Sequence, residues 1–357
     1  MNEIVAIRPG LETLDPAWLA GRRVGLVAHP ASLVSDGRHA AEYLREAGVN
    51  LVALFGPEHG FFGRGGAGEP IADAAHVDWK IPIFSLYGET RAPTPAMLDL
   101  GDVFVFDVQT IACRAYTYVS TLRMLMEACA AAGKTLVVAD RPDPLMLTPP
   151  DGPLLDPACA SFVGRVPTPF CYGMTPGETA LYLRDALQLD TLDLHVAPCA
   201  GLSRSLSLAQ IYPTWQATSP AIVSLENALC FPLTVLFEAL PMIDHARGTP
   251  LAFQRIGSAH ADLSRLELPP LPGLRVAPCE YPDKHGQNLR GRAFEVVDPA
   301  AYRPALSAFT LISALENHVG PALWEFPGTR PDFYAQLWGT RTPAPPWAGF
   351  EIRQSLY

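Results

Sequence analysis

Short apolar runs alternate with polar stretches through the first half of the chain. The runs span residues 24–28, 51–55, 81–86, 103–106 and 135–139. Continuous apolar runs of this kind are typical of parallel strands that are buried on both faces. Each gap between them is long enough for a helix, for example over 38–47 and 121–132. Strands that alternate with helices predict a parallel βαβ sheet.

Polar residues follow these runs, which predicts a site at one edge of the sheet. Ligands of open α/β sheets bind beyond the carboxyl ends of the strands. Glu58 and His59 follow the second run directly, on a turn that Pro57 stiffens. Two other runs end in the same way, the fourth in Asp107 and Gln109 and the fifth in Asp140 and Arg141.

The second half of the chain predicts one more strand and then a smaller domain. A helix begins after Thr175, because Thr175 and Glu178 form a capping box around a proline. The pattern then indicates strands over 192–197, 274–277 and 293–297, and helices from 224 and over 304–317. We therefore predict an α/β fold: a Rossmann-like parallel-sheet domain over residues 1–217 that carries the catalytic loops, and a smaller α+β domain over 218–357 that closes the cleft.

The charge of the chain argues against two classes of partner. The net charge is −10 and no basic stripe is present, whereas nucleic acids and anionic membranes need clustered cations. No apolar run approaches the length of a transmembrane helix. The N-terminus lacks the basic and apolar segments of a signal peptide, so we expect a cytoplasmic protein unless a leader has been removed. The partner that we expect is a small-molecule substrate, and the oligomeric state is left open.

We expect neither a metal nor a nucleotide cofactor. The seven cysteines are scattered without a C-x-x-C pair, and the histidines show no H-x-H or H-E-x-x-H spacing. The glycine-rich stretch 63–68 lacks the lysine of a phosphate-binding loop, and it does not match a dinucleotide-binding motif between a strand and a helix. A nucleotide-dependent Rossmann enzyme is therefore the least favoured function.

Glu58, His59 and Glu69 are the candidate catalytic residues. Glu58 and His59 lie where a cleft would open and can act as general acid and base, although Glu58 could instead cap a following helix. Glu69 closes the glycine-rich loop, which could bring it near Glu58, or it is a solvent-exposed loop acid. Cleavage of a glycosidic bond typically uses two carboxyl groups about 5 to 9.5 Å apart. Asp107 is another candidate for the second carboxyl group.

The candidate substrate-binding residues follow the fourth strand. Asp107 and Gln109 can accept hydrogen bonds from sugar hydroxyls or donate to them. Arg114 suits a carboxylate, because its guanidinium binds such a group in a bidentate way. Tyr116 and Tyr118 either stack on a pyranose ring or pack beneath the edge of the sheet.

Three more charged residues leave a binding and a structural interpretation open. Asp140 and Arg141 either bind a substrate or brace the rigid loop that Pro142 begins. Arg247 is either an anion clamp that reaches across the cleft or part of a surface turn.

Several motifs, in order along the chain, resemble those of the exo-β-N-acetylmuramidase family, long described as a domain of unknown function. The Gly-Pro-Glu-His-Gly-Phe motif around Glu58 is one of them. The motifs lie at residues 56–61, 67–69, 85–88, 91–95, 105–109, 114–122, 140–144, 152–157, 172–178 and 247–249. The resemblance implies a Rossmann-like domain and a smaller domain, with the site in the cleft between them.

The resemblance also implies an activity. Members of this family remove N-acetylmuramic acid from the non-reducing end of peptidoglycan fragments without a metal or nucleotide. Glu58 then corresponds to the catalytic acid. The lactyl carboxylate of the sugar would explain arginines such as Arg114 and Arg247. The implied function is a glycoside hydrolase of cell wall recycling.

Two positions depart from the family pattern. Thr110 stands where relatives usually carry an acid, and His245 stands near a family glutamate. These changes motivate an alternative function, that of a non-catalytic or altered-specificity relative that binds amino sugars or muropeptides.

Overall fold

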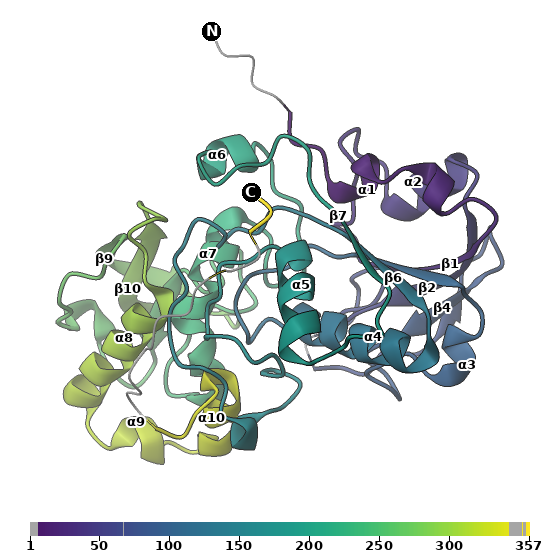
Figure 1. Ribbon diagram of the computed structural model, residues 1–357. Coiled ribbons are helices and arrows are strands. Elements are labelled where there is room, and N and C mark those ends of the chain that lie inside the picture. The colour runs from purple at the N-terminus through teal and green to yellow at the C-terminus, as the bar shows by residue number, and fades with distance from the viewer. Residues whose placement is uncertain (1–5, 67, 343–351, 353–354) are drawn as a thin grey trace, which may run out of the picture.

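The computed structural model describes residues 6–66, 68–342, 352 and 355–357, so the motif at 67–69 is described from Gly68 onward (Figure 1). A seven-stranded sheet has the order β3-β4-β2-β1-β5-β6-β7, and only the β3–β4 pair is antiparallel. Its strands are β1 Arg23–Ala28, β2 Asn50–Gly56, β3 Ala74–Ala75, β4 Pro82–Ser85, β5 Val103–Asp107, β6 Thr135–Ala139 and β7 Leu194–Ala197. Without β3 this is the strand order of the Rossmann fold. The predicted α/β fold is confirmed.

Side chains of the central strands alternate between two apolar layers. On β5, Phe104 and Phe106 face the layer that includes α4 and α5, whereas Val103 and Val105 face the layer of α1 and α2. Both layers exclude water, which explains why the strands appear in the sequence as uninterrupted apolar runs. The helices of this half are α1 Gly10–Thr13, α2 Ala40–Glu46, α3 Pro95–Leu98, α4 Tyr118–Ala132, α5 Pro176–Ala186 and α6 Leu208–Ile211.

One gap between the predicted strands holds no helix among the described residues. The segment between β2 and β4 was expected to have room for a helix, but it forms a glycine-rich loop and the short strand β3. Gly60, Gly63 and Gly68 adopt positive φ angles there, a conformation that interrupts a helix. The loop is therefore free to form a rim beyond the end of β2.

The second half of the chain packs against the sheet domain through a shared core. A three-stranded antiparallel sheet, in the order β8-β10-β9, lies beside α7 and α8 (Figure 1). A single cluster of buried side chains runs from Phe106 in the parallel sheet to Leu233 in α7 and Leu311 in α8. The elements are α7 Leu225–Thr234, β8 Arg255–Ser258, β9 Leu274–Pro282, β10 Asn288–Val296, α8 Pro304–Val319, α9 Ala322–Glu325 and α10 Pro331–Trp338. The domain boundary at 217/218 stays a prediction.

Arg114 is a structural brace in this core and not an exposed binding residue. Its side chain is fully buried, and burial lowers its pKa to about 10. Its guanidinium donates to the carbonyl oxygens of Pro153, Thr168 and Trp338. These bonds join the loop before α5 to the end of α10, so the expectation that Arg114 binds a substrate carboxylate is corrected.

Replacing Arg114 by methionine should destabilise the protein. Three buried carbonyl groups would lose their donor, and each unsatisfied group costs about 1 to 3 kcal/mol. We expect thermal unfolding by circular dichroism to show a fall of several degrees in the midpoint. An unchanged midpoint together with a selectively weakened affinity for substrate would contradict this structural role.

Asp143 supports the loops after β5 and β6 from inside the core. Its Oδ1 accepts from the backbone N–H groups of Ala112 and Leu145 at 2.9 Å each, and its Oδ2 accepts from Thr110 Oγ1 at 2.8 Å. Burial raises the pKa of Asp143 to about 7, even though these hydrogen bonds lower it. Because the pKa is higher in the folded state than the ordinary value of 3.8 for this side chain, folding favours the protonated acid.

Stability should therefore fall as the pH rises from about 4 through about 7, by at most on the order of 4 kcal/mol for this group. Asp143→Asn keeps an oxygen acceptor and carries no charge, so its stability should depend less on pH and should exceed that of the wild type at pH 8. Urea unfolding at several pH values measures this difference. Parallel pH profiles for the two proteins would refute it.

Candidate active site

A cavity of about 550 Å³ lies between the loops of the parallel sheet and the second half of the chain. This size is within the range of small-molecule sites. Apolar walls come from Phe231, Val235, Phe253 and Leu337, among others. The polar residues of its lining include Glu58, His59, Tyr87, Tyr116, Thr117, Tyr118, Glu238, Arg247 and Arg330. The sequence therefore predicted five residues that share this cavity, namely Glu58, His59, Tyr116, Tyr118 and Arg247.

Glu58 is held at the wall of the cavity by two hydrogen bonds. It follows the Gly56-Pro57 turn at the end of β2 and is only 8% exposed. Oε1 accepts from the backbone N–H of Gly68 at 2.8 Å, and Oε2 accepts from Thr117 Oγ1 at 2.6 Å. The rim loop and the residue that precedes α4 thus fix both carboxylate oxygens. Glu58 begins no helix, so the capping alternative does not apply.

His59 adopts a left-handed backbone conformation beside Glu58, with φ of 69°. Its Nδ1 lies 2.8 Å from the carbonyl oxygen of Gly65. A carbonyl can only accept, so Nδ1 carries a proton and donates it to this oxygen. The ring is thereby oriented by the glycine-rich loop.

Tyr116 and Tyr118 line the cavity and also bind the segment that begins the second half of the chain. The Tyr116 hydroxyl donates to Thr218 Oγ1, and the Tyr118 hydroxyl donates to the Thr218 carbonyl, both at 2.8 Å. Burial raises the pKa of both phenols above the usual value. The two sequence interpretations, stacking and packing, are compatible here, because both residues line the cavity while their hydroxyls form hydrogen bonds to Thr218.

Glu238, Arg247 and Arg330 form the charged wall that the second half contributes. Glu238 lies in the 3-10 helix Val235–Ala239 and forms an ion pair with Arg247. Burial raises the pKa of Glu238, and Glu58 raises it further, whereas Arg247 lowers it. The sequence patterns did not single out Glu238 or Arg330 as site residues. The resemblance offered a signal only for Glu238, which lies close to the family motif around Arg247.

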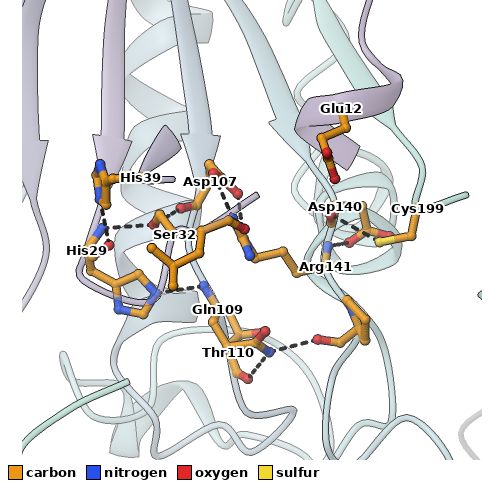
Figure 2. A network of polar contacts seen from close by, with 12 residues as sticks. Glu12, His29, Ser32, His39, Asp107, Gln109, Thr110, Asp140, Arg141 and Cys199 are labelled. Carbon is orange, nitrogen blue, oxygen red and sulfur yellow. Dashed lines mark hydrogen bonds and ion pairs between the residues drawn. The ribbon is translucent and has the colours of Figure 1, made fainter. Parts of the chain in front are cut away.

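A polar network at the carboxyl edge of the sheet holds four other predicted residues away from the cavity lining (Figure 2). Asp107 and Arg141 form a buried ion pair, in which Arg141 Nε lies 2.5 Å from Asp107 Oδ1. Asp140 accepts from the backbone N–H of Gly177 at the start of α5. Gln109 donates to the carbonyl oxygen of Pro142. These contacts favour bracing over direct sugar binding for the four residues, because each side chain has an internal partner and none of them lines the cavity.

The same network lies at the carboxyl ends of β1 and β5, where a Rossmann domain would bind a dinucleotide. Ser32 donates to the backbone carbonyl of Asp107, and His29 Nε2 accepts from the backbone N–H of Gln109 (Figure 2). Burial, reinforced by the charge of Arg141, lowers the pKa of His29 to about 3, so the ring is neutral. These contacts give no support to a nucleotide-dependent enzyme.

Glu69 lies outside the cavity lining. Its side chain is exposed, and Oε2 accepts from the backbone N–H of Gly66 at 2.9 Å. The expectation of a second catalytic carboxylate at Glu69 is corrected, since this acid closes its own loop instead. Within the described ranges, no cluster of His, Cys, Asp or Glu has the arrangement of a metal site, and no helix is long and apolar enough to cross a membrane.

The chain is similar in sequence to one family over most of its length. The profile described as "Exo-beta-N-acetylmuramidase NamZ, N-terminal" matches residues 24–226, and its C-terminal counterpart matches residues 229–343. The peptidoglycan beta-N-acetylmuramidase NamZ of Bacillus subtilis (strain 168) is 35% identical over 265 residues. That alignment covers 73% of this chain but 64% of the relative, so the chain spans less than two thirds of the relative's length.

Two crystal structures from Bacteroides fragilis NCTC 9343, both of DUF1343 family proteins, share the fold. One is 30% identical with a TM-score of 0.84, and the match covers 94% of this chain and 90% of that protein. The other is 24% identical with a TM-score of 0.71 over 94% and 89% of the two chains, which shows a likeness of fold alone. Together with the sequence motifs, these similarities show that the chain belongs to the exo-β-N-acetylmuramidase NamZ family.

Proposed function

We propose that this protein is a glycoside hydrolase that removes β-linked N-acetylmuramic acid from the non-reducing end of peptidoglycan fragments. The observation that carries the proposal is the position of Glu58, whose two carboxyl oxygens are fixed at the wall of a sugar-sized cavity. Membership of the family and the named activity of the Bacillus subtilis relative support the choice of substrate.

Glu58 is the proposed general acid, which gives its proton to the leaving glycosidic oxygen. The Thr117 hydroxyl donates to one lone pair of Oε2 and leaves the second position on this oxygen free to carry the proton that is given to the glycosidic oxygen. The Gly68 N–H holds the other oxygen in place in both states. These two contacts keep the acid oriented before and after the step, which general acid catalysis requires.

Glu238 is the proposed second carboxylate. Among the described residues that line the cavity, Glu58 and Glu238 are the two that carry carboxyl groups. The ion pair with Arg247 favours the ionised form of Glu238, which opposes the effect of burial. A carboxylate at this position would stabilise the positive charge that develops at the anomeric carbon, or would activate a nucleophile there.

The alternative of a non-catalytic binding protein rests on the changes at Thr110 and His245. Neither residue lines the cavity: Thr110 donates to Asp143 in the core, and His245 packs against Phe253. Both proposed catalytic carboxylates are present. The positions that depart from the family pattern therefore leave the proposed machinery intact, which favours an enzyme.

We also propose that the protein acts in a reducing compartment such as the cytoplasm. All seven cysteines are free thiols, and six of them are buried. Disulfides are typical of proteins in oxidising compartments, whereas cysteines that stay unpaired are typical of proteins in reducing compartments.

Replacing Glu58 by glutamine should abolish most hydrolysis while leaving binding intact. With a disaccharide that carries N-acetylglucosamine as leaving group, we expect kcat to fall by about 100- to 10,000-fold. With 4-nitrophenol, a leaving group that needs little protonation, the loss should be clearly smaller. Steady-state kinetics on both substrates measure the two losses. Equal losses on both would argue against general acid catalysis by Glu58.

Glutamine substitutions at Glu238 and Glu69 distinguish the two candidates for the second carboxylate. Glu238→Gln should lower kcat by about 100-fold or more, because it removes a charge from the cavity wall. Glu69→Gln serves as the matched comparison and should stay within about threefold of the wild type, because Glu69 faces solvent. A larger loss of kcat in Glu69→Gln than in Glu238→Gln would instead identify Glu69 as the second carboxylate.

A further inference from the structure

The cavity contains two arginines, and only one of them is neutralised by a carboxylate. Arg247 forms its ion pair with Glu238. Arg330 also lines the cavity, but the described residues include no acidic side chain in an ion pair with it. Its Nη2 donates to the backbone carbonyl of Glu238 at 2.6 Å, which uses one of its five N–H groups. The other N–H groups are available to a ligand.

The guanidinium of Arg330 is also held in a defined position. Its Cζ lies 4.3 Å from the centroid of the Phe333 ring, and Phe333 lines the same cavity. The backbone N–H of Arg330 donates to the carbonyl of Ala239 at 3.0 Å, which ties the start of α10 to the 3-10 helix that carries Glu238. A guanidinium that is fixed before the ligand arrives loses less entropy on binding.

The charge balance of the cavity points to an anionic ligand. Glu238 and Arg247 compensate each other. Glu58 must be protonated, and hence neutral, at the moment when it acts as a general acid. In that state Arg330 is the one charged lining group that forms no direct ion pair among the described residues, and it interacts with Glu238 only at longer range, so a negative group on the substrate would be stabilised beside it.

We propose, on the basis of the function proposed above, that Arg330 binds the lactyl carboxylate of N-acetylmuramic acid. This carboxylate is the group that distinguishes the sugar from N-acetylglucosamine, so Arg330 is a specificity-determining residue. Arg247 is a poorer candidate because its guanidinium already forms a direct ion pair with Glu238, whereas Arg330 has no such pair among the described residues. A site built around a charged group rejects analogues that lack this group, because its own polar atoms are then left unpaired.

The test compares 4-nitrophenyl N-acetyl-β-muramide with its neutral lactyl carboxamide. We expect the wild type to favour the carboxylate in kcat/KM by about 10- to 100-fold, the range of charge-assisted hydrogen bonds. Arg330→Met should bring this ratio close to one by losing activity on the carboxylate only, mainly through KM. Arg330→Lys should keep part of the preference for the carboxylate, since lysine retains the positive charge but cannot bind a carboxylate in a bidentate way.

Arg341→Met is the matched control. Arg341 is an exposed arginine that pairs with Asp332 and does not line the cavity, so the ratio should stay at the wild-type value. Thermal unfolding checks that each variant is folded. An unchanged ratio in Arg330→Met, or equal losses on both substrates, would overturn the assignment.

Binding measurements separate a failure of this inference from a failure of the proposed hydrolysis. If the wild type cleaves neither glycoside, the proposed activity fails, and calorimetry with free N-acetylmuramic acid and its lactyl carboxamide decides the role of Arg330. Tighter binding of the acid, lost in Arg330→Met, would support the inference without any catalysis. Equal binding of the two sugars by the wild type would overturn it.

Discussion

A parallel sheet that is buried on both faces can place polar side chains only at the ends of its strands. In this protein the faces of β1, β2, β5 and β6 are covered by two apolar layers. Polar groups therefore collect at the carboxyl edge, where each one must find a partner or meet a cavity. This constraint divides the residues of the edge into two groups, those that brace the loops and those that face the ligand site.

The bracing group makes the ligand site rigid. The Asp107–Arg141 ion pair, the Arg114 guanidinium and the Asp143 carboxyl group join loops from distant parts of the sequence. A buried ion pair of this kind adds little net stability. Removing one of its two residues destabilises the fold strongly, because the other charge is then buried without a partner. With these loops fixed, Glu58 needs only the Gly68 N–H and the Thr117 hydroxyl to hold its orientation. Pre-organisation of this kind favours catalysis, because the geometry is fixed before the substrate binds.

The sequence predicted the sheet well because its signal is local. Five apolar runs and the capping box at Thr175 each lie within a few residues, and each became the predicted element. The segment between β2 and β4 was harder to predict, because its length permits a helix that its glycines do not form. The strands β9 and β10 extend beyond their predicted ranges since many of their side chains are exposed and give no apolar run.

The site was predicted only in part, because it joins residues that are far apart in the sequence. Glu58 and His59 were found from their place after a strand. Sequence alone could not separate Arg114, which is buried, from Arg330, which lines the cavity, because this difference is set by tertiary packing. Glu238 could not be predicted for the same reason. It is far from Glu58 in the sequence, and only the folded structure places both residues at one cavity.

The central claim is that this cavity releases N-acetylmuramic acid from the end of a peptidoglycan fragment. The most direct measurement is to incubate the purified protein with a disaccharide that carries N-acetylmuramic acid at its non-reducing end, and to identify the products by mass spectrometry. The account predicts free N-acetylmuramic acid and N-acetylglucosamine in equal amounts from the wild type and almost none from Glu58→Gln. An intact disaccharide with a folded wild-type protein, or equal release by both proteins, would contradict it.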